Sequence, residues 1–98
     1  MPIIFMENRY FVYIIYSDNH DKYYRGYSTN PIKRLIQHNN QESEYTSKFC
    51  PWELVYIEEV PTKSDAIKRE KGLKKYAKNQ IEDLIKLPKN IINQFSLE

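Results

Sequence analysis

A glutamate stands in the middle of an apolar helical stripe, where a charged side chain is least expected. Ala66, Glu70, Leu73 and Ala77 are spaced i, i+4, i+7 and i+11, so they share one face of a helix. An ionised carboxylate that faces a core is costly unless it is paired or binds a cation. Glu70 is therefore a candidate metal ligand. Spacing alone leaves open a glutamate at the edge of the stripe, or one paired with an arginine.

An arginine and a histidine on an earlier segment could act together. Arg34 and His38 stand four residues apart, so on a helix they share one face. By helical angle they flank an apolar stripe, which would place them at the rim of a cleft. Such pairs are also common on plain surfaces, and taken alone this pair favours that interpretation.

Tyrosine is enriched, with nine residues of this type in a chain of 98. Tyr13 lies at the centre of a predicted strand, and Tyr24 and Tyr27 lie on the next one. A buried phenol needs a hydrogen-bond partner, which Arg34 or Glu70 could provide. The alternative is an aromatic cluster that only packs.

Positive charge is concentrated in the second half of the chain. Residues 1–60 hold six Lys and Arg against eight Asp and Glu, whereas residues 61–98 hold nine against five. A basic helix is a plausible phosphate-binding face, and a merely solvated helix is the alternative. The basic residues of this helix are Lys63, Lys68, Arg69, Lys71, Lys74, Lys75 and Lys78.

Two strands are predicted to open the fold as a hairpin. Residues 9–16 are aromatic and β-branched on both alternating faces, as in a central strand of a covered sheet. Residues 18–21 form a polar turn, and residues 22–27 resume as a strand. Gly26 in this second strand marks either a bulge or a place where another group approaches closely.

Helices and a third strand follow. Asn30 and Pro31 begin a helix that runs to about His38, with Ile32, Leu35 and Ile36 toward the core. Residues 39–51 read as a polar loop, and residues 52–60 as an edge strand. A longer helix is predicted over residues 64–78, capped by Ser64 or Thr62, and Asn79 caps a short helix over residues 80–86.

This order, ββαβαα, predicts an α+β domain with a three-stranded antiparallel sheet flanked by helices. We expect an N-terminal extension over residues 1–8, the domain over 9–87 and a C-terminal tail over 88–98 that folds back or frays. The chain carries a single cysteine, Cys50, which excludes an internal disulfide, argues against zinc and suits a reducing cytoplasm. No apolar run reaches membrane-spanning length, and no cleaved signal is expected.

Four short motifs follow one another along the chain: Phe11-Val12-Tyr13, Tyr24-Arg25-Gly26, Arg34-x-x-x-His38 and Lys68-Arg69-Glu70. In this order they resemble the GIY-YIG nucleases, which include the nuclease module of bacterial excision-repair enzymes and certain homing endonucleases. The small stand-alone bacterial members look most similar, over about residues 9–80. The first two signatures read FVY and YRG here; each keeps its tyrosine, and Arg25 replaces a residue that is usually aliphatic.

The resemblance implies an endonuclease that hydrolyses nucleic-acid phosphodiesters with one metal ion, and suggests DNA repair as its setting. Glu70 would hold Mg²⁺ or Mn²⁺, with water and phosphate oxygen as the other ligands. Tyr13 would take a proton from the attacking water, and nearby positive charge must then favour its phenolate. Arg34 would stabilise the pentacovalent phosphate. The groups that would orient water and phosphate are Tyr24, Tyr27 and His38.

The same resemblance implies DNA, in preference to RNA, as the partner. Backbone phosphates would be bound by Lys68, Arg69, Lys74 and Lys75, and Arg25 would face either solvent or a substrate phosphate. With no targeting domain in 98 residues, specificity would come from a protein partner, a homodimer or substrate shape. Two alternatives are a nucleic-acid-binding module without catalysis, and a structural domain in which Glu70 faces solvent.

Overall fold

The computed structural model describes residues 9–95, so the predicted extension 1–8 and the last three residues of the predicted tail lie outside the described residues. The elements follow in the order β1 (Tyr10–Ser17), β2 (Lys22–Ser28), α1 (Pro31–Asn39), α2 (Glu44–Ser47), β3 (Glu53–Val60), α3 (Lys63–Leu73), α4 (Lys78–Ile85) and the 3₁₀ helix η2 (Ile92–Gln94).

The sheet has the order β2-β1-β3, and both neighbours of β1 pair with it antiparallel. Phe11 to Ile15 of β1 are all buried, because helices cover both faces of this strand. The predicted α+β fold, with β1 at the centre and β3 at an edge, is confirmed.

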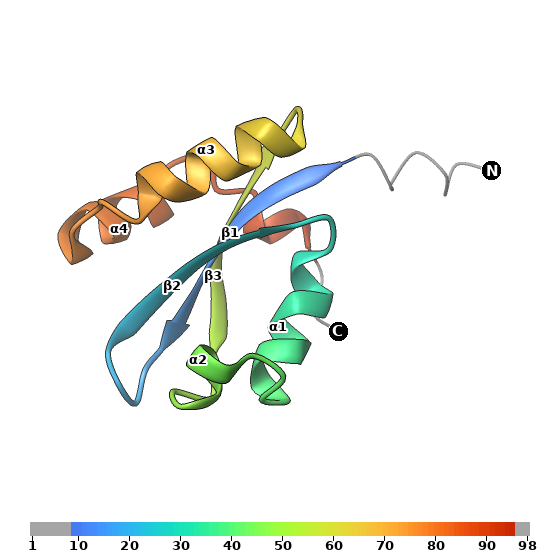
Figure 1. Ribbon diagram of the computed structural model, residues 1–98. Helices are drawn as coiled ribbons and strands as arrows, with labels where there is room; N and C mark the ends of the chain where they lie inside the picture. Colours follow the sequence, from blue (N-terminus) through green and yellow to red (C-terminus); the bar gives the residue numbers. More distant parts are fainter. Residues whose placement is uncertain (1–8, 96–98) are drawn as a thin grey trace.

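Helices form a layer on each face of the sheet (Figure 1). On one face, α3 and α4 cover a core that includes Val12, Ile14 and Tyr56. On the other face, α1, α2 and the C-terminal segment cover Tyr13, Ile15 and Trp52. Because β-strand side chains alternate, Tyr13 and its neighbour Ile14 belong to different layers.

α1 begins as predicted, since the Asn30 side chain accepts a hydrogen bond from the Lys33 N–H at 3.0 Å. The prediction that Ile36 faces the core is wrong, because its side chain is 54% exposed. The buried side of α1 is centred on Pro31 and His38, and Ile36 stands two residues from His38, on nearly the opposite side. His38 is therefore fully buried instead of lying at a rim.

Three further predictions about individual helices are wrong. The predicted loop 39–51 contains the short helix α2. α3 ends at Leu73, and Ala77, predicted to extend its apolar stripe, is exposed at the start of α4. Ala77 rather than Asn79 precedes α4, and its N–H donates to the Gln80 side chain at 2.7 Å. Of the two predicted caps for α3, Thr62 is the one observed.

Residues 90–95 of the predicted tail fold back onto the sheet. The Asn90 side chain accepts from the Ile57 N–H at 3.1 Å and donates to the Val55 carbonyl at 3.1 Å. The Phe95 ring packs edge-on against Phe11, with centroids 5.3 Å apart. Among the described residues, the helices are too short and too polar to cross a membrane.

Candidate active site

The Tyr13 phenol crosses the neighbouring strand at a glycine. Tyr13 of β1 and Gly26 of β2 are directly paired, and a Cβ atom on Gly26 would lie 2.5 Å from the Tyr13 hydroxyl oxygen. Any residue with a side chain would displace the phenol, because contacts this short do not occur between real atoms. The prediction that Gly26 permits a close approach is confirmed, and the approaching group is Tyr13.

Tyr13, His38 and Thr46 form a buried chain of hydrogen bonds. The Tyr13 hydroxyl lies 2.9 Å from His38 Nε2, and His38 Nδ1 lies 2.8 Å from the Thr46 hydroxyl. Each of the three residues is at most 1% exposed. Burial and, secondarily, the charge of Arg34 lower the pKa of His38 to about 4. His38 is therefore neutral at pH 7, with one ring nitrogen protonated.

Several charged and polar groups act on the Tyr13 hydroxyl. Burial raises the pKa of Tyr13, while a hydrogen bond from Arg34 and its charge lower that pKa, and Tyr24 and Glu70 add smaller upward contributions. The expected positive charge is thus present as Arg34, but burial outweighs it, and Tyr13 is a protonated phenol at pH 7. Arg34, Tyr24 and Glu70 thus each influence the pKa of Tyr13, and together with His38 and Tyr13 itself we call these residues the Tyr13 cluster.

Arg34 and Tyr24 are positioned by neighbours of their own. The Arg34 guanidinium donates to the Gln37 side chain at 2.6 Å. The Tyr24 ring packs edge-on against His38, with centroids 5.3 Å apart, and lies 6.0 Å from Tyr45. Gln37 and Tyr45 were not singled out in the sequence, since a polar helical residue and a loop tyrosine carry no distinguishing pattern.

Glu70 approaches from α3, which contacts β2. Its side chain is 16% exposed, so the alternative in which Glu70 simply faces solvent does not hold. One carboxylate oxygen lies 3.6 Å from the Lys74 ammonium, four residues further along the helix. Within residues 9–95 no three His, Cys, Asp or Glu side chains gather to hold a metal. Glu70 thus offers one carboxylate, which fits a hard cation that keeps most of its water.

Two predicted residues, Tyr27 and Arg25, are placed differently from the expectation. Tyr27 packs with the core under α3 and α4, on the opposite face of the sheet from Tyr13. The Arg25 guanidinium donates to the carbonyls of Tyr23, Leu73 and Tyr76 at 3.1–3.3 Å. It caps the end of α3, where helix carbonyls lack partners, in place of the predicted contact with solvent or phosphate.

Arg69 is likewise engaged inside the protein. Its Nε donates to Glu58 at 3.0 Å, and the same carboxylate accepts from the Tyr56 hydroxyl. The pair is less than a quarter exposed, so Arg69 holds α3 to β3 in place of the predicted phosphate contact. The other predicted phosphate-binding residues, Lys68, Lys74 and Lys75, are exposed.

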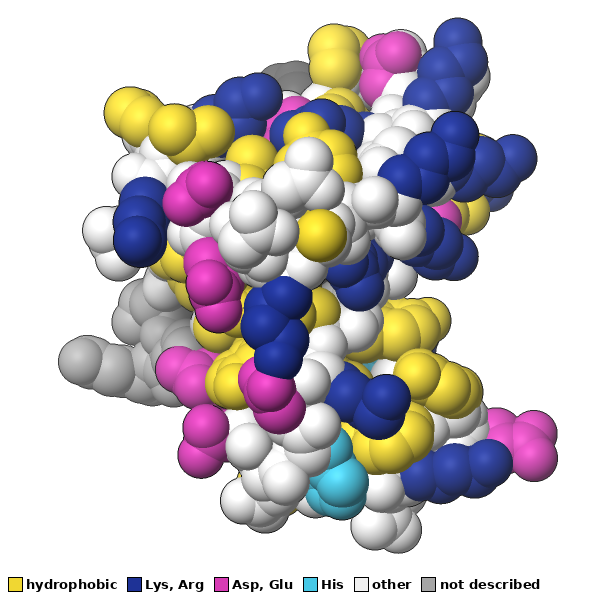
Figure 2. All heavy atoms as spheres, turned by 90° about the vertical axis from the view of Figure 1, so that its left-hand side faces the viewer, with side chains coloured by type: hydrophobic (Ala, Val, Ile, Leu, Met, Phe, Trp, Pro, Cys, Tyr) yellow, Lys and Arg dark blue, Asp and Glu magenta, His cyan; other side chains and the backbone are white. Residues whose placement is uncertain are grey.

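We define the α3 lysine group as the exposed residues Lys68, Lys71, Lys74 and Lys75. Figure 2 shows Lys and Arg side chains gathered at the upper right of one face, with side chains of the hydrophobic class below them. Lys74 links this group to the Tyr13 cluster, because it is the lysine beside Glu70.

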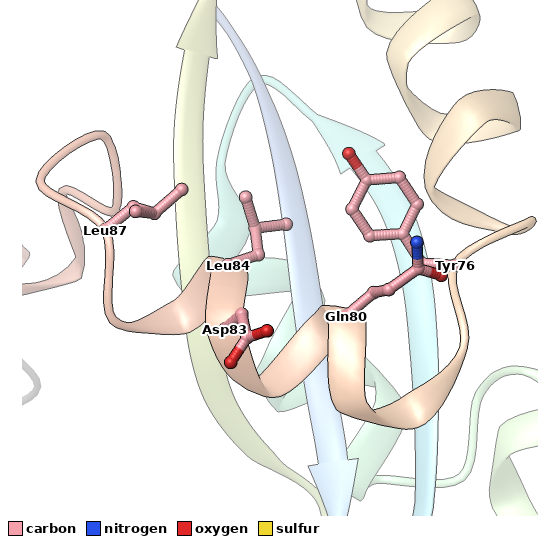
Figure 3. Close-up of a pocket in the computed structure, with 5 residues that line it drawn as sticks. All are labelled: Tyr76, Gln80, Asp83, Leu84 and Leu87. Carbon is pink, nitrogen blue, oxygen red and sulfur yellow. The ribbon is translucent and has the colours of Figure 1, made fainter.

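A separate groove runs along α4 and is lined by Tyr76, Gln80, Asp83, Leu84 and Leu87 (Figure 3). The groove contains none of the residues predicted for catalysis, and Asp83 is its single carboxylate. The chemistry of the Tyr13 cluster therefore does not extend into this groove.

Fold and cluster together define a class of protein. Residues 9–82 match the family model described as the GIY-YIG catalytic domain. The chain belongs to the GIY-YIG family, whose domains are nucleases.

Within that family, the similar proteins are small bacterial ones. A UPF0213 protein of Staphylococcus epidermidis is 42% identical over 74 residues, which span 74% of this chain and 89% of that protein. One of Enterococcus faecalis is 34% identical over 87 residues, spanning 83% and 97%. The solution NMR structure of a UPF0213 protein from Bacillus halodurans superposes with a TM-score of 0.53 at 26% identity, covering 92% of this chain and 97% of that one.

Proposed function

We propose that this protein is a metal-dependent endonuclease that hydrolyses phosphodiester bonds of nucleic acid, with DNA as the first substrate class to test. The observation that supports this most is the placement of the Tyr13 hydroxyl, which passes over Gly26, lies 2.9 Å from His38 Nε2 and has a pKa influenced by Arg34, Tyr24 and Glu70. A phenol, a guanidinium and a carboxylate would supply a base, a phosphate-charge stabiliser and a cation ligand.

Glu70 would hold the divalent cation, Mg²⁺ or Mn²⁺. When bound, such an ion polarises the scissile phosphate and stabilises the leaving oxygen. Lys74, 3.6 Å from Glu70 and 57% exposed, is free to turn toward a backbone phosphate once another cation neutralises that carboxylate.

Tyr13 acts as the base. In the free protein its hydroxyl carries a proton, because burial raises its pKa. Once that proton has passed to bulk water, the phenolate oxygen would take one from the attacking water, whose oxygen bonds to phosphorus as the bond to the leaving oxygen breaks. Arg34 would donate hydrogen bonds to the phosphate as negative charge develops there. His38 holds the Tyr13 oxygen in place at 2.9 Å, and Tyr24 orients the water and phosphate.

The α3 lysine group would bind the nucleic-acid backbone. Two of its exposed ammonium groups lie on α3 and two on the residues directly after it, and all four suit contacts with phosphates. Contacts of this kind position a substrate without reading its sequence, so a protein partner or a homodimer would supply targeting. We place this activity in the cytoplasm, as the single thiol of Cys50 suits, with DNA repair as its proposed setting.

A binding module without turnover is the second candidate, and the raised pKa of Tyr13 favours it, because a protonated phenol is no base. Nicking of supercoiled DNA with Mn²⁺ separates the two. We expect cleavage by the wild type, loss of at least 100-fold in Glu70→Gln, and no change in Glu82→Gln, a matched substitution at an exposed glutamate of α4.

A chelator should abolish the wild-type cleavage. Equal nicking by wild type and Glu70→Gln would show that this carboxylate does not serve the reaction. DNA binding by both proteins with no cleavage by either would favour the second candidate.

A further inference from the structure

Arg25 is a partly buried arginine whose hydrogen bonds all go to backbone carbonyls. Its guanidinium donates to the carbonyls of Leu73 and Tyr76 at 3.1 Å each, and to the carbonyl of Tyr23 at 3.3 Å. Within residues 9–95 it forms no ion pair with a carboxylate. The partial negative charge of the carbonyls at the end of α3 therefore serves as its counter-charge.

The end of α3 lacks the local turn with which helices commonly stop. Such a turn places a glycine or asparagine in the left-handed conformation, where the chain pairs the last carbonyls of the helix. Among the described residues a positive φ occurs only at Asp21 and Gln41, and neither of them follows α3. Arg25 thus supplies from strand β2 the hydrogen bonds that a local turn would otherwise provide.

Glu70 belongs to the turn of α3 that Arg25 holds. The Glu70 carbonyl accepts a hydrogen bond from the Lys74 N–H at 3.1 Å, which closes the last turn. Leu73, whose carbonyl Arg25 binds, stands three residues after Glu70 and on the same side of the helix. A movement of this end of α3 would therefore carry the Glu70 side chain with it.

The position of Arg25 in β2 links this turn to Tyr13. Arg25 is paired with Ile14 of β1, and the next residue, Gly26, is paired with Tyr13 and lies against its phenol. Successive side chains of a strand point to opposite faces, so Arg25 reaches α3 while Gly26 leaves room for the phenol. Two consecutive residues of β2 thus contact Tyr13 and hold the helix that carries Glu70.

We propose that Arg25 is a positioning residue, which holds the last turn of α3 and thereby sets the place of Glu70 relative to Tyr13. Arg25 acts through the backbones of α3 and β2. Its part in cleavage rests on the proposed function, in which Glu70 holds the cation and Tyr13 is the base. The alternative is that its hydrogen bonds stabilise the fold as a whole and leave the place of Glu70 unchanged.

Hydrogen exchange of backbone amides tests the hold on α3 without metal or substrate. Arg25→Met keeps an unbranched side chain and removes the donors. We expect exchange at the Lys74 and Tyr76 amides to become about tenfold faster, as for the loss of hydrogen bonds from a charged donor, while the amides of β1 exchange as before. Arg9→Met, which removes an exposed ion pair with Glu59, is the matched control and should leave the end of α3 unchanged.

Unchanged exchange at the end of α3 in Arg25→Met, or equal acceleration throughout the protein, would overturn the proposal. If Arg25→Met gives no dispersed amide spectrum, Arg25→Lys is measured in its place with the same expectation. This variant keeps a cation but has a single nitrogen to offer the three carbonyls.

Mn²⁺ added below one equivalent tests the place of Glu70. This paramagnetic ion broadens the signals of nearby amides, and the effect falls steeply with distance. In the wild type we expect broadening both around Glu70 and at Gly26, and Glu70→Gln should lose both. In Arg25→Met the broadening around Glu70 should persist, and that at Gly26 should weaken. Unchanged broadening at Gly26 in this variant would overturn the positioning role, because a contribution to stability alone would not move the ion.

Cleavage kinetics distinguish this proposal from the proposed function. Arg25→Met should lower kcat about tenfold with KM unchanged, because a misplaced Glu70 stabilises the transition state less, and Arg9→Met should keep the wild-type kcat. If the broadening changes as expected but no protein cleaves DNA, the proposed activity fails and the positioning role stands. If the wild type and Arg25→Met cleave DNA at the same rate, the positioning role fails and the proposed function stands.

Discussion

Acid should destabilise this protein through His38, whose imidazole is buried in its neutral form. Its pKa is about 4 in the folded protein against 6.5 for the ordinary side chain. Because the folded pKa is the lower one, the unfolded chain binds more protons between these values. The stabilisation from His38 is therefore complete above pH 6.5 and is lost as the pH falls toward 4. A span of about 2.5 pH units, at about 1.4 kcal/mol each, corresponds to about 3 kcal/mol.

Urea denaturation at several pH values between 7.5 and 4.5 measures this loss as a fall in the free energy of unfolding. His38→Gln is the matched comparison, since glutamine retains a donor and an acceptor but does not titrate. Asp21 and Glu59, whose pKa values are lowered by ion pairs with Lys78 and Arg9, also weaken in acid, but equally in both proteins. Parallel curves for the two proteins would refute the buried neutral imidazole.

The remaining predictions concern catalysis and binding. Gly26→Ala should lower kcat by about 100-fold, because the new methyl group would displace the Tyr13 hydroxyl. Gly72→Ala, whose methyl group meets nothing within 4 Å, should leave kcat unchanged. Equal values of kcat for the two variants would show that the passage of Tyr13 over Gly26 does not matter for cleavage. The logarithm of kcat/KM should rise by about one per pH unit from pH 6 to 9, since the base must lose a proton and its pKa is raised. No break should occur near pH 6.5, because the buried His38 stays neutral. The double variant Lys68→Gln with Lys75→Gln should weaken binding to unrelated DNA sequences to the same extent. The slope of log K against log salt concentration, measured by fluorescence anisotropy, should become shallower by about 0.9 per lost phosphate contact, and an unchanged slope would show that these lysines do not contact DNA.

The sheet and its helices were predictable because their patterns are local. An apolar run on both faces identified β1 as the central strand, and the Asn30-Pro31 pair marked the start of α1. Gly26 was recognisable as a place of close approach from its type and position alone.

The end of α3 was not predictable, because a contact across 48 residues decides it. Arg25 of β2 donates to the carbonyl of Leu73, and no local pattern announces such a cap. The short helix α2 was not predicted because its four residues are too few to show a helical period.

The sequence predicted part of the candidate site. Residue types and order selected Tyr13, Arg34, His38 and Glu70. In the structure His38 lies 2.9 Å from the Tyr13 hydroxyl, and Arg34 and Glu70 influence the pKa of Tyr13. The depth at which His38 lies, and its partner Thr46, depend on how α2 packs against α1, which the sequence pattern does not encode. The contacts of Arg25 with the Tyr76 carbonyl and of Arg69 with Glu58 were not predicted either, because charge alone does not distinguish a contact within the protein from a contact with phosphate.

Single-turnover cleavage of DNA by Tyr13→Phe tests the central claim most directly, because this change removes one oxygen and keeps the ring that packs over Gly26. Tyr16→Phe is the control, on the same strand, where the lost hydroxyl only bonds Asp21. We predict that Tyr13→Phe cleaves at least 100-fold more slowly than the wild type, while Tyr16→Phe cleaves at the wild-type rate. Wild-type cleavage by Tyr13→Phe would contradict the account, since the base would then be another group.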